Sequence, residues 1–249
     1  MGLKLVPELA EFLGIIVGDG NIYYDRLKRT YRFVITGHLE NDFSYLTDYV
    51  SNLIIKLFGK KPGIWKYKKK KAIGIALYSR QIIDSLLSLG LKAGKKSQTV
   101  EIPKLILESD KSIKSSFLRG VADTDFCISF DKSRINYPTI CGSTSSKTLA
   151  YQIKELLKEF NIISTVTIRK PRGFSKVNQY VISCYGLKNY NLWVEQIGFR
   201  NENHLSKIFV WKVLGFYPPF ISLKERLLIL SNNNVDVLWD TTALNRKVG

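Results

Sequence analysis

The sequence predicts an α+β protein made of two αββαββα repeats, related by a pseudo-twofold axis and packed through their first helices. The first observation behind this prediction is a pair of similar stretches, FLGIIVGDG (12–20) and LRGVADTDF (118–126). They align over Asp19 and Asp125, which are 106 residues apart. The second observation is that each stretch precedes the same succession of apolar and polar segments.

Two further pairs of segments keep nearly the same spacing. VITG (34–37) is similar to TICG (139–142), and SLLSLGL (85–91) is similar to LWVEQIGF (192–199). Three landmarks in one order and at nearly one offset indicate an internal duplication. We therefore expect an N-terminal repeat over 1–96, a linker over 97–111, and a C-terminal repeat with an extension over 112–249.

Each repeat is expected to open with a short apolar helix, over 7–18 in the first and 112–124 in the second. Pro7 suits the first turn of one helix, and Ser112 is expected to cap the other. A hairpin rich in Tyr, Ile, Phe and Val follows in both repeats. Each of these hairpins supplies two strands of a sheet.

The rest of each repeat follows the same plan. Apolar residues at helical spacing predict amphipathic helices over 41–59 and 145–160. A second, strongly basic hairpin follows over 61–79 and 164–184, which completes a four-stranded antiparallel sheet in each repeat. A third helix should end near a glycine, Gly90 in one repeat and Gly198 in the other, because glycine adopts the left-handed conformation that terminates helices.

The charge balance indicates a polyanionic partner. The chain of 249 residues has 38 Lys and Arg against 21 Asp and Glu, a formal net charge of +17. Such an excess favours nucleic acid or an acidic membrane surface. The sequence shows no apolar stretch long enough to span a bilayer and no signal peptide, so we expect a cytoplasmic protein without a membrane partner.

The cysteines and histidines argue against a zinc centre. Cys127, Cys141 and Cys184 are far apart in sequence and form no CxxC pair, so we expect them to be small core residues in a reducing compartment. His38 and His204 are the only histidines. Any metal must therefore be held by oxygen ligands.

Asp19 and Asp125 are the candidates to hold such a metal. Asp19 ends an apolar helix, where the negative end of the helix dipole disfavours a carboxylate. Small residues on both helices, such as Gly14 and Gly120, allow close packing, which would bring the two acids together. A hard divalent cation relieves their repulsion and also accepts phosphate oxygens. For Asp19 alone the alternative is a turn, since Asp before Gly is a common turn signal.

The two stretches resemble the paired signature motifs of LAGLIDADG homing endonucleases, of the monomeric two-repeat type encoded in archaeal and organellar introns. The resemblance covers nearly the whole chain, and only loosely residues 200–249. It implies double-strand cleavage of a long, non-palindromic DNA target, with Mg²⁺ or another divalent cation such as Mn²⁺. It assigns the metals to Asp19 and Asp125, assisted by the backbone carbonyls of Gly18 and Thr124.

The same resemblance implies cleavage at two phosphates across the minor groove, with one acid serving each strand. It places such a protein in the nucleoid of a prokaryote, an archaeon in particular, or in an organelle matrix. The chain departs from the motif at Phe126, where Gly is usual, and at Val17, where the motif's first Asp is kept only as Asp123. A lysine after the third helix is matched by Lys96, whose counterpart in the second repeat is His204.

A further departure concerns the end of the second strand. The family usually has a polar, water-ordering residue there, but this chain has Gly37 and Gly142. The neighbours His38 and Ser143 are the candidate substitutes. We therefore expect Lys96, His204 and His38 around the catalytic acids.

The two sheets are expected to follow the major groove on either side of the cleavage point, as β-ribbons can. In the lysine run 66–71, Lys69 and Lys70 fit phosphate contacts and a solvated loop equally well. The candidate DNA contacts are Tyr24, Arg26, Lys28, Arg32, Lys66, Lys68, Tyr78, Arg80, Lys132, Arg134, Asn136, Arg169, Arg172, Lys176, Asn178 and Gln179.

Three other functions stay open. The same fold could bind nucleic acid without cutting it, above all as an intron RNA maturase, in which case the partner is intron RNA. A restriction-type nuclease could use the acidic cluster ESDK (108–111), which has no counterpart in the other repeat. A membrane-surface role is disfavoured because the sequence shows no basic amphipathic helix.

Overall fold

A computed structural model describes residues 3–131, 137–171 and 176–235. Its elements follow the predicted order, αββαββα twice, which confirms the α+β fold class. The elements of the first repeat are α1 (Pro7–Val17), β1 (Gly20–Asp25), β2 (Thr30–His38), η1 (Tyr45–Val50), α2 (Ser51–Phe58), β3 (Gly63–Tyr67), η2 (Lys68–Lys70), β4 (Ala72–Tyr78) and α3 (Arg80–Ser88). Those of the connecting segment and the second repeat are α4 (Lys104–Leu107), α5 (Lys111–Asp125), β5 (Phe126–Asp131), β6 (Tyr137–Thr144), α6 (Lys147–Glu159), β7 (Thr165–Arg169), β8 (Gln179–Tyr185) and α7 (Gly186–Gln196), followed by α8 (Glu202–Leu214) and α9 (Leu223–Asn232).

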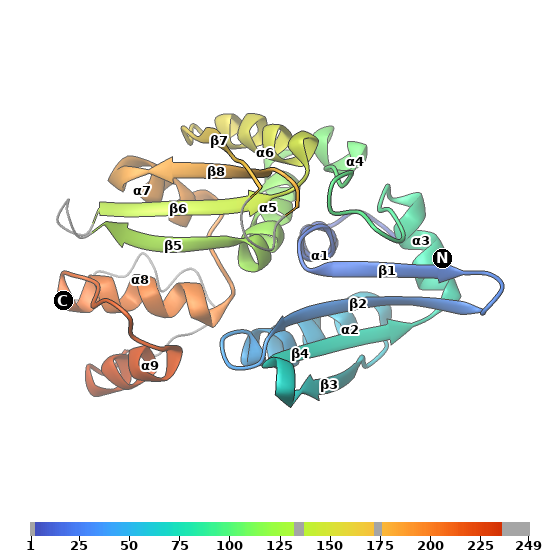
Figure 1. The fold of residues 1–249 in the computed structure, drawn as a ribbon, viewed down its shortest axis with the longest axis horizontal. Coiled ribbons are helices and arrows are strands. Elements are labelled where there is room, and N and C mark those ends of the chain that lie inside the picture. The colour runs from blue at the N-terminus through green and yellow to red at the C-terminus, as the bar shows by residue number, and fades with distance from the viewer. Residues whose placement is uncertain (1–2, 132–136, 172–175, 236–249) are drawn as a thin grey trace.

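The two repeats build two antiparallel sheets of the same topology. The strand order is β1-β2-β4-β3 in the first sheet and β5-β6-β8-β7 in the second. Figure 1 shows α1 and α5 side by side between the sheets, with β1 and β5 running outward from them in opposite directions. Helices α8 and α9 extend the second repeat beside the β5 edge (Figure 1). No helix among the described residues is both long and apolar enough to cross a membrane.

Helices α1 and α5 pack at backbone contact. A Cβ added to Gly14 would lie 2.2 Å from the carbonyl oxygen of Phe117, and one added to Gly120 would lie 2.1 Å from that of Glu11. Since real atoms cannot approach so closely, only glycine fits at either position. The two contacts are related by the same 106-residue offset as the motifs, so the sequence repeat is also a structural one.

A buried ion pair joins the repeats beside this contact. Glu11 of α1 accepts hydrogen bonds from the Arg119 guanidinium of α5, at 2.9 Å from Nε and 2.7 Å from Nη2. The Tyr49 hydroxyl donates to the other Glu11 oxygen at 2.5 Å. Arg119 also donates to the carbonyl oxygen of Ile197 at 3.0 Å. Because a buried charge is costly unless it is paired and hydrogen-bonded, this network fixes how the two helices meet.

Two local predictions are confirmed and one is wrong. Pro7 begins α1, and the glycines after the third helices, Gly90 and Gly198, have φ of +97° and +73°. Ser112 does not cap α5. The cap is Asp110, whose carboxylate accepts from the backbone N–H groups of Ser112 at 2.8 Å and Ile113 at 3.1 Å, because Asp at that position reaches two free donors of the first turn.

The cysteine prediction holds for one residue of three. Cys184 is buried in the core, as predicted. Cys127 and Cys141 are partly exposed, and their sulfur atoms lie 3.4 Å apart. The distance in sequence was misleading because β5 and β6 form one hairpin, whose register places the two residues directly opposite each other.

Candidate active site between the two repeats

The two acids lie where the ends of α1 and α5 meet. Asp125 is the last residue of α5, and Asp19 lies between α1 and the start of β1. A Cβ added to Gly18 would lie 2.0 Å from Oγ1 of Thr124 and 3.2 Å from Oδ2 of Asp125. The Asp125 carboxylate therefore reaches across to the end of the opposite helix, and Gly18 leaves the space for it.

The electrostatics of the two acids are unfavourable without a cation. Desolvation of the carboxylate, then the negative charges of Asp125 and Asp42, raise the pKa of Asp19, although the residue as a whole is exposed to water. Desolvation raises the pKa of Asp125 to about 6. Both carboxylates therefore lie in a setting that favours neutralisation, by protons or by a bound cation.

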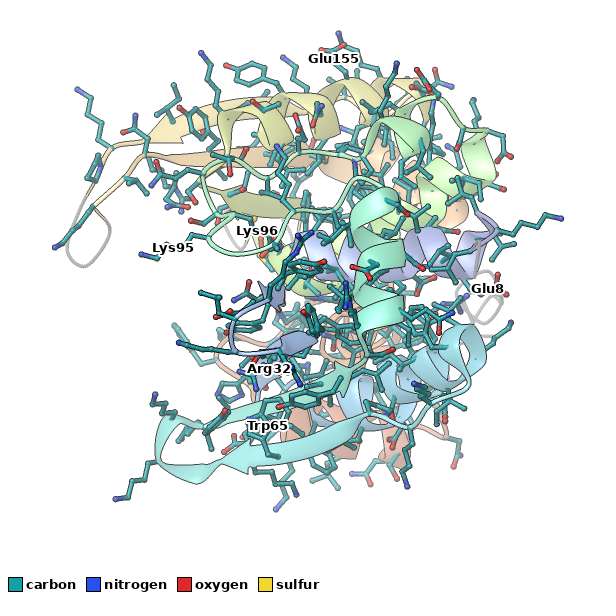
Figure 2. The ribbon with its side chains drawn as sticks, turned by 90° about the vertical axis from the view of Figure 1, so that its right-hand side faces the viewer. Glu8, Arg32, Trp65, Lys95, Lys96 and Glu155 are labelled. Atoms are coloured by element: carbon teal, nitrogen blue, oxygen red, sulfur yellow. The ribbon has the colours of Figure 1, made fainter. Side chains whose placement is uncertain are left out.

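Lys96 supplies a positive charge that acts on both acids. Its Nζ donates to the carbonyl oxygens of Ile16, Val17 (2.5 Å) and Gly18 (3.3 Å), so it caps the negative end of α1. Burial lowers its pKa to about 8, against the opposing charges of Asp125 and Asp19. In Figure 2, Lys96 lies against the body of the protein, whereas its neighbour Lys95 points away from it.

A cleft of about 430 Å³ opens at this junction. It takes its walls from both repeats and from the segment that follows α3. Its lining residues are Val17, Gly18, Gly20, Asn21, Gly94, Lys95, Lys96, Ser97, Val100, Asp125, Ser143, Thr144, Ser145 and Gln179. Among the sequence-predicted residues it brings together Gly18, Asp125, Lys96, Ser143 and Gln179.

The donor set at the junction suits a hard divalent cation. Its members are the carboxylates of Asp19 and Asp125 and the backbone carbonyls of Gly18 and Thr124, all of them oxygen. The described residues contain no group of three or more His, Cys, Asp or Glu side chains arranged to hold a metal. A cation here would therefore complete its coordination with water and substrate oxygens, as Mg²⁺ commonly does.

Comparison with known proteins supports the same interpretation of the fold. Residues 112–198 match the family model of the LAGLIDADG-like domain. The structure superposes on variants of the homing endonuclease I-DmoI with a TM-score of 0.56 and 19% identity, over 77% of this chain and 95% of that one. This chain has a two-repeat LAGLIDADG fold. The homing endonuclease I-WcaI, bound to its DNA recognition sequence, matches at a TM-score of 0.52 and 12% identity, over 79% of this chain and 82% of that one.

The curated relatives are longer proteins of unrelated names. The replication factor C small subunits of Methanocaldococcus jannaschii and Thermococcus kodakarensis are each 29% identical, over 81% and 80% of this chain. The replicative DNA helicase DnaB of Rhodothermus marinus is 29% identical over 77% of it. The chain spans only 10%, 20% and 20% of their lengths, so the similarity is confined to one segment of each relative.

The first Asp of the second LAGLIDADG motif has a structural role. Asp123 is buried, and its carboxylate accepts from the backbone N–H groups of Arg200, at 2.9 and 3.0 Å, and Asn201, at 2.9 Å. Asn201 in turn donates its side-chain amide to Asp42 of the first repeat at 2.8 Å. Asp123 thus anchors the segment leading into α8. At the matching position Val17 has no carboxylate, and the segment after α3 is instead bound through Lys96, whose Nζ donates to the Val17 carbonyl oxygen.

Asp42 is a residue that the sequence reasoning missed. Its carboxylate accepts from the backbone N–H of His38 at 2.7 Å, and a Cβ on Gly37 would lie 2.9 Å from the Asp42 Cβ. Asp42 therefore fills the space above Gly37, where a polar strand-end residue was expected. In the second LAGLIDADG repeat the ring of Phe126 fills the matching space above Gly142. In the sequence, the one sign of this role is that Asp42 follows His38 by four residues, which is a weak signal.

Neither histidine is among the residues that line the cleft. His204 is buried with its ring 4.8 Å from that of Phe199, and burial lowers its pKa to about 3. His38 ends β2, where its Nδ1 accepts from the backbone N–H groups of Glu40 and Asn41 at 3.3 Å. Lys96 lines the cleft and the histidines do not, and the roles predicted for Lys96, His204 and His38 stay predictions.

Strand alternation divides the first sheet into a packed face and an open face. Arg32 lies on the open face, where its Nη1 donates to the Tyr78 hydroxyl at 2.6 Å and its guanidinium lies 4.6 Å from the centre of the Tyr23 ring. Trp65 lies on the same face, flat against Gly74. Arg32 and Trp65 are both labelled on the sheet of the first repeat in Figure 2. The open face thus carries an arginine held between aromatic rings.

Several predicted contacts lie elsewhere in the first repeat. The Tyr24 ring packs edge-on against Tyr31 at 5.1 Å, on the packed face, so its neighbour Tyr23 takes the open face. Lys66 turns the same way as Tyr24, with Nζ 4.4 Å from the centre of the Phe43 ring.

The remaining candidates of the first repeat lie at the rim of the sheet. Arg26 and Arg80 line a hollow with Tyr31 at the far end of the β1–β2 hairpin. Lys28 is in the hairpin turn, its backbone N–H bound to the Asp25 carboxylate at 2.9 Å, and Lys68 begins η2.

In the second repeat, Arg169 and Gln179 are opposite each other at the ends of β7 and β8, on the open face. Lys176 and Asn178 are exposed just before β8. The other candidates lie outside the described residues. They are Lys132, Arg134, Asn136 and Arg172.

Proposed function

We propose that this protein is a site-specific homing endonuclease that cuts both strands of a long, non-palindromic DNA duplex. The observation that carries the proposal is one carboxylate at the end of each motif helix, Asp19 and Asp125, meeting at the junction of two open sheet faces. One chain thereby supplies an acid for each strand, so it is proposed to act as a monomer. The proposed repeats are 1–96 and 112–249, joined by 97–111.

Solved relatives support a DNA substrate and a divalent cation. I-DmoI has been described in complex with DNA and Mn and in complex with DNA and Ca. The matching junction here offers only oxygen donors, which suits Mg²⁺ or Mn²⁺. Bound there, such a cation would activate water for attack on phosphorus and stabilise the leaving oxygen.

The chain's own residues have separate tasks in this proposal. Asp19 and Asp125, with the carbonyls of Gly18 and Thr124, hold the cations. Lys96 keeps the end of α1 in place and lowers the pKa of both acids, which opposes the rise that their burial causes. Arg32, Tyr23 and Tyr78 on one sheet, and Arg169 and Gln179 on the other, contact the DNA on either side.

The test is a cleavage screen. Purified protein is incubated with a randomised duplex library and Mg²⁺, with EDTA as control, and the ends are sequenced. The expected result is one long site, cut on both strands only with the metal. Enrichment of a bound sequence without cutting would instead identify a non-cleaving binder, and the next substrate to examine would be intron RNA.

Once the site is known, the acids can be tested singly. Asp19→Asn and Asp125→Asn should each abolish double-strand cleavage while leaving the dissociation constant for the site within a few-fold of wild type. Asp48→Asn, an exposed change on η1, is the matched control and should cut normally. Wild-type cleavage by either active-site variant would refute the proposed metal site.

A further inference from the structure

A pair of thiols lies on the open face of the second sheet. Cys127 of β5 and Cys141 of β6 are direct register partners, with their sulfur atoms 3.4 Å apart. Directly opposed residues of antiparallel strands have Cα atoms about 4.5 or 5.5 Å apart, within the range of about 4.4–6.8 Å that a disulfide requires. The two sulfur atoms can therefore bond through side-chain rotation without separating the strands.

Both thiols are accessible to reagents. Cys127 and Cys141 are each partly exposed, whereas Cys184 is buried on the other face of the sheet. Strand alternation puts the pair on the same face as Ser129, Ser143 and Thr165. Residues of the packed face, such as Ile128 and Ile140, alternate with the thiols along both strands.

We propose that Cys127 and Cys141 form a redox-active dithiol that reacts with small disulfides such as oxidised glutathione. In the first step one thiolate attacks a sulfur of the disulfide, which forms a mixed disulfide and releases one small thiol. The second cysteine then attacks the protein sulfur of that adduct and releases the other small thiol. The protein pair loses two electrons and two protons, and one small disulfide is reduced to two thiols.

The position of the pair means that its modification would affect the face proposed to bind DNA. An adduct left on either sulfur would stand on the face proposed to meet DNA, near the start of β5, which directly follows Asp125. Resolution by the second cysteine removes the adduct and leaves a bridge no bulkier than the two side chains. The dithiol is thus a site that clears its own modification.

The experiment treats the full chain with oxidised glutathione, blocks remaining thiols with an alkylating agent, and identifies the products by mass spectrometry. Wild type should form the Cys127–Cys141 bridge and retain little mixed disulfide. Cys127→Ser and Cys141→Ser should each retain a mixed disulfide on the surviving thiol, at least tenfold more than wild type. Cys184→Ala, the buried control, should behave as wild type.

Two results would overturn the proposal. One is wild-type protein that accumulates a mixed disulfide as the single-cysteine variants do. The other is a bridge that involves Cys184. Normal circular dichroism of each variant shows that the comparison is made on folded protein.

A second arm adds excess duplex DNA at low salt, and this arm depends on the proposed function. Bound DNA should slow the reaction of the pair several-fold without changing its product. An unchanged rate would contradict the placement of DNA on this face. It would not affect the dithiol proposal, which the reaction without DNA tests separately.

Discussion

At the scale of single residues, Lys96 favours the ionised form of both acids against the effect of burial. It lowers the pKa of both Asp19 and Asp125 and caps the backbone of α1. Lys95, its exposed neighbour, points away from the body of the protein in Figure 2 and serves as a matched control.

We predict that Lys96→Met lowers the cleavage rate about 10²-fold and moves the acidic limb of the pH–rate profile to higher pH. Removing the ammonium group raises the pKa of both acids, so a higher pH is needed to ionise them. The acidic limb of the profile should move by about one pH unit. Single-turnover cleavage from pH 5 to 9 measures both effects. Lys95→Met should keep the wild-type profile, and a profile unmoved in Lys96→Met would remove Lys96 from the site.

A second prediction at this scale concerns the effect of Asp125 on stability. Because its pKa of about 6 in the folded protein exceeds the usual value of 3.8, ionising it costs stability. Asp125→Asn should therefore raise the free energy of unfolding of the metal-free protein by about 1–3 kcal/mol at pH 7. The gain should shrink as pH falls from 6 to 4, where the wild-type acid becomes protonated in the folded state.

Thermal unfolding in EDTA measures this effect, with a Tm increase of about 2–4 °C for each kcal/mol. Asp48→Asn, at an exposed site, should change Tm little at any pH. A lower Tm for Asp125→Asn would show that the ionised carboxylate stabilises the fold, which would contradict this prediction.

At the scale of elements, the packing of α1 against α5 positions the acids. Gly14 and Gly120 bring the helix backbones together, and Glu11 and Arg119 fix their orientation through the buried pair. The two helix ends, and with them Asp19 and Asp125, can meet only at this separation.

Gly14→Ala should therefore lower the free energy of unfolding by at least about 2 kcal/mol, because its Cβ would lie 2.2 Å from the Phe117 oxygen. Gly63→Ala is the control, since an added Cβ would meet no atom nearer than 3.9 Å, and it should change stability by less than about 0.5 kcal/mol. Urea denaturation compares the two. Equal effects would mean that the helices can move apart without cost.

At the scale of the whole molecule, the net charge of +17 and the two open sheet faces are the features that would hold the proposed DNA substrate. If about 6–10 phosphates are neutralised, the affinity for duplex DNA should fall about 10³–10⁵-fold between 50 and 200 mM salt. Fluorescence anisotropy across that range gives the slope. A nearly flat dependence would be incompatible with DNA gripped through its phosphates.

The same titration separates the two interpretations of Lys69 and Lys70, which are exposed in η2. Replacing both with Gln should reduce the salt slope by about one for each phosphate that these lysines neutralise in the wild-type complex. Where the loop is merely solvated, the slope should stay that of the wild type.

The repeat and the paired acids could be predicted because they recur in the same order and at nearly the same offset along the chain. Asp19 and Asp125 occupy equivalent places in a duplicated motif, and the segments after them have helical or alternating periodicity that survives folding. The two-repeat α+β fold follows from those patterns and is confirmed.

Only the tertiary structure decided which side chains share a surface. Tyr23 lies on the open face and Tyr24 on the packed one, since one residue along a strand reverses the direction of the side chain. The hydrogen bonds that Asn201 donates to Asp42 and Arg119 donates to Glu11 join residues far apart in sequence. The approach of Cys127 to Cys141 likewise depends on how a hairpin pairs. The periodicity of apolar residues predicts which side of an element faces the core. Contacts between elements depend on how the elements pack in three dimensions, and a local sequence pattern does not contain that information.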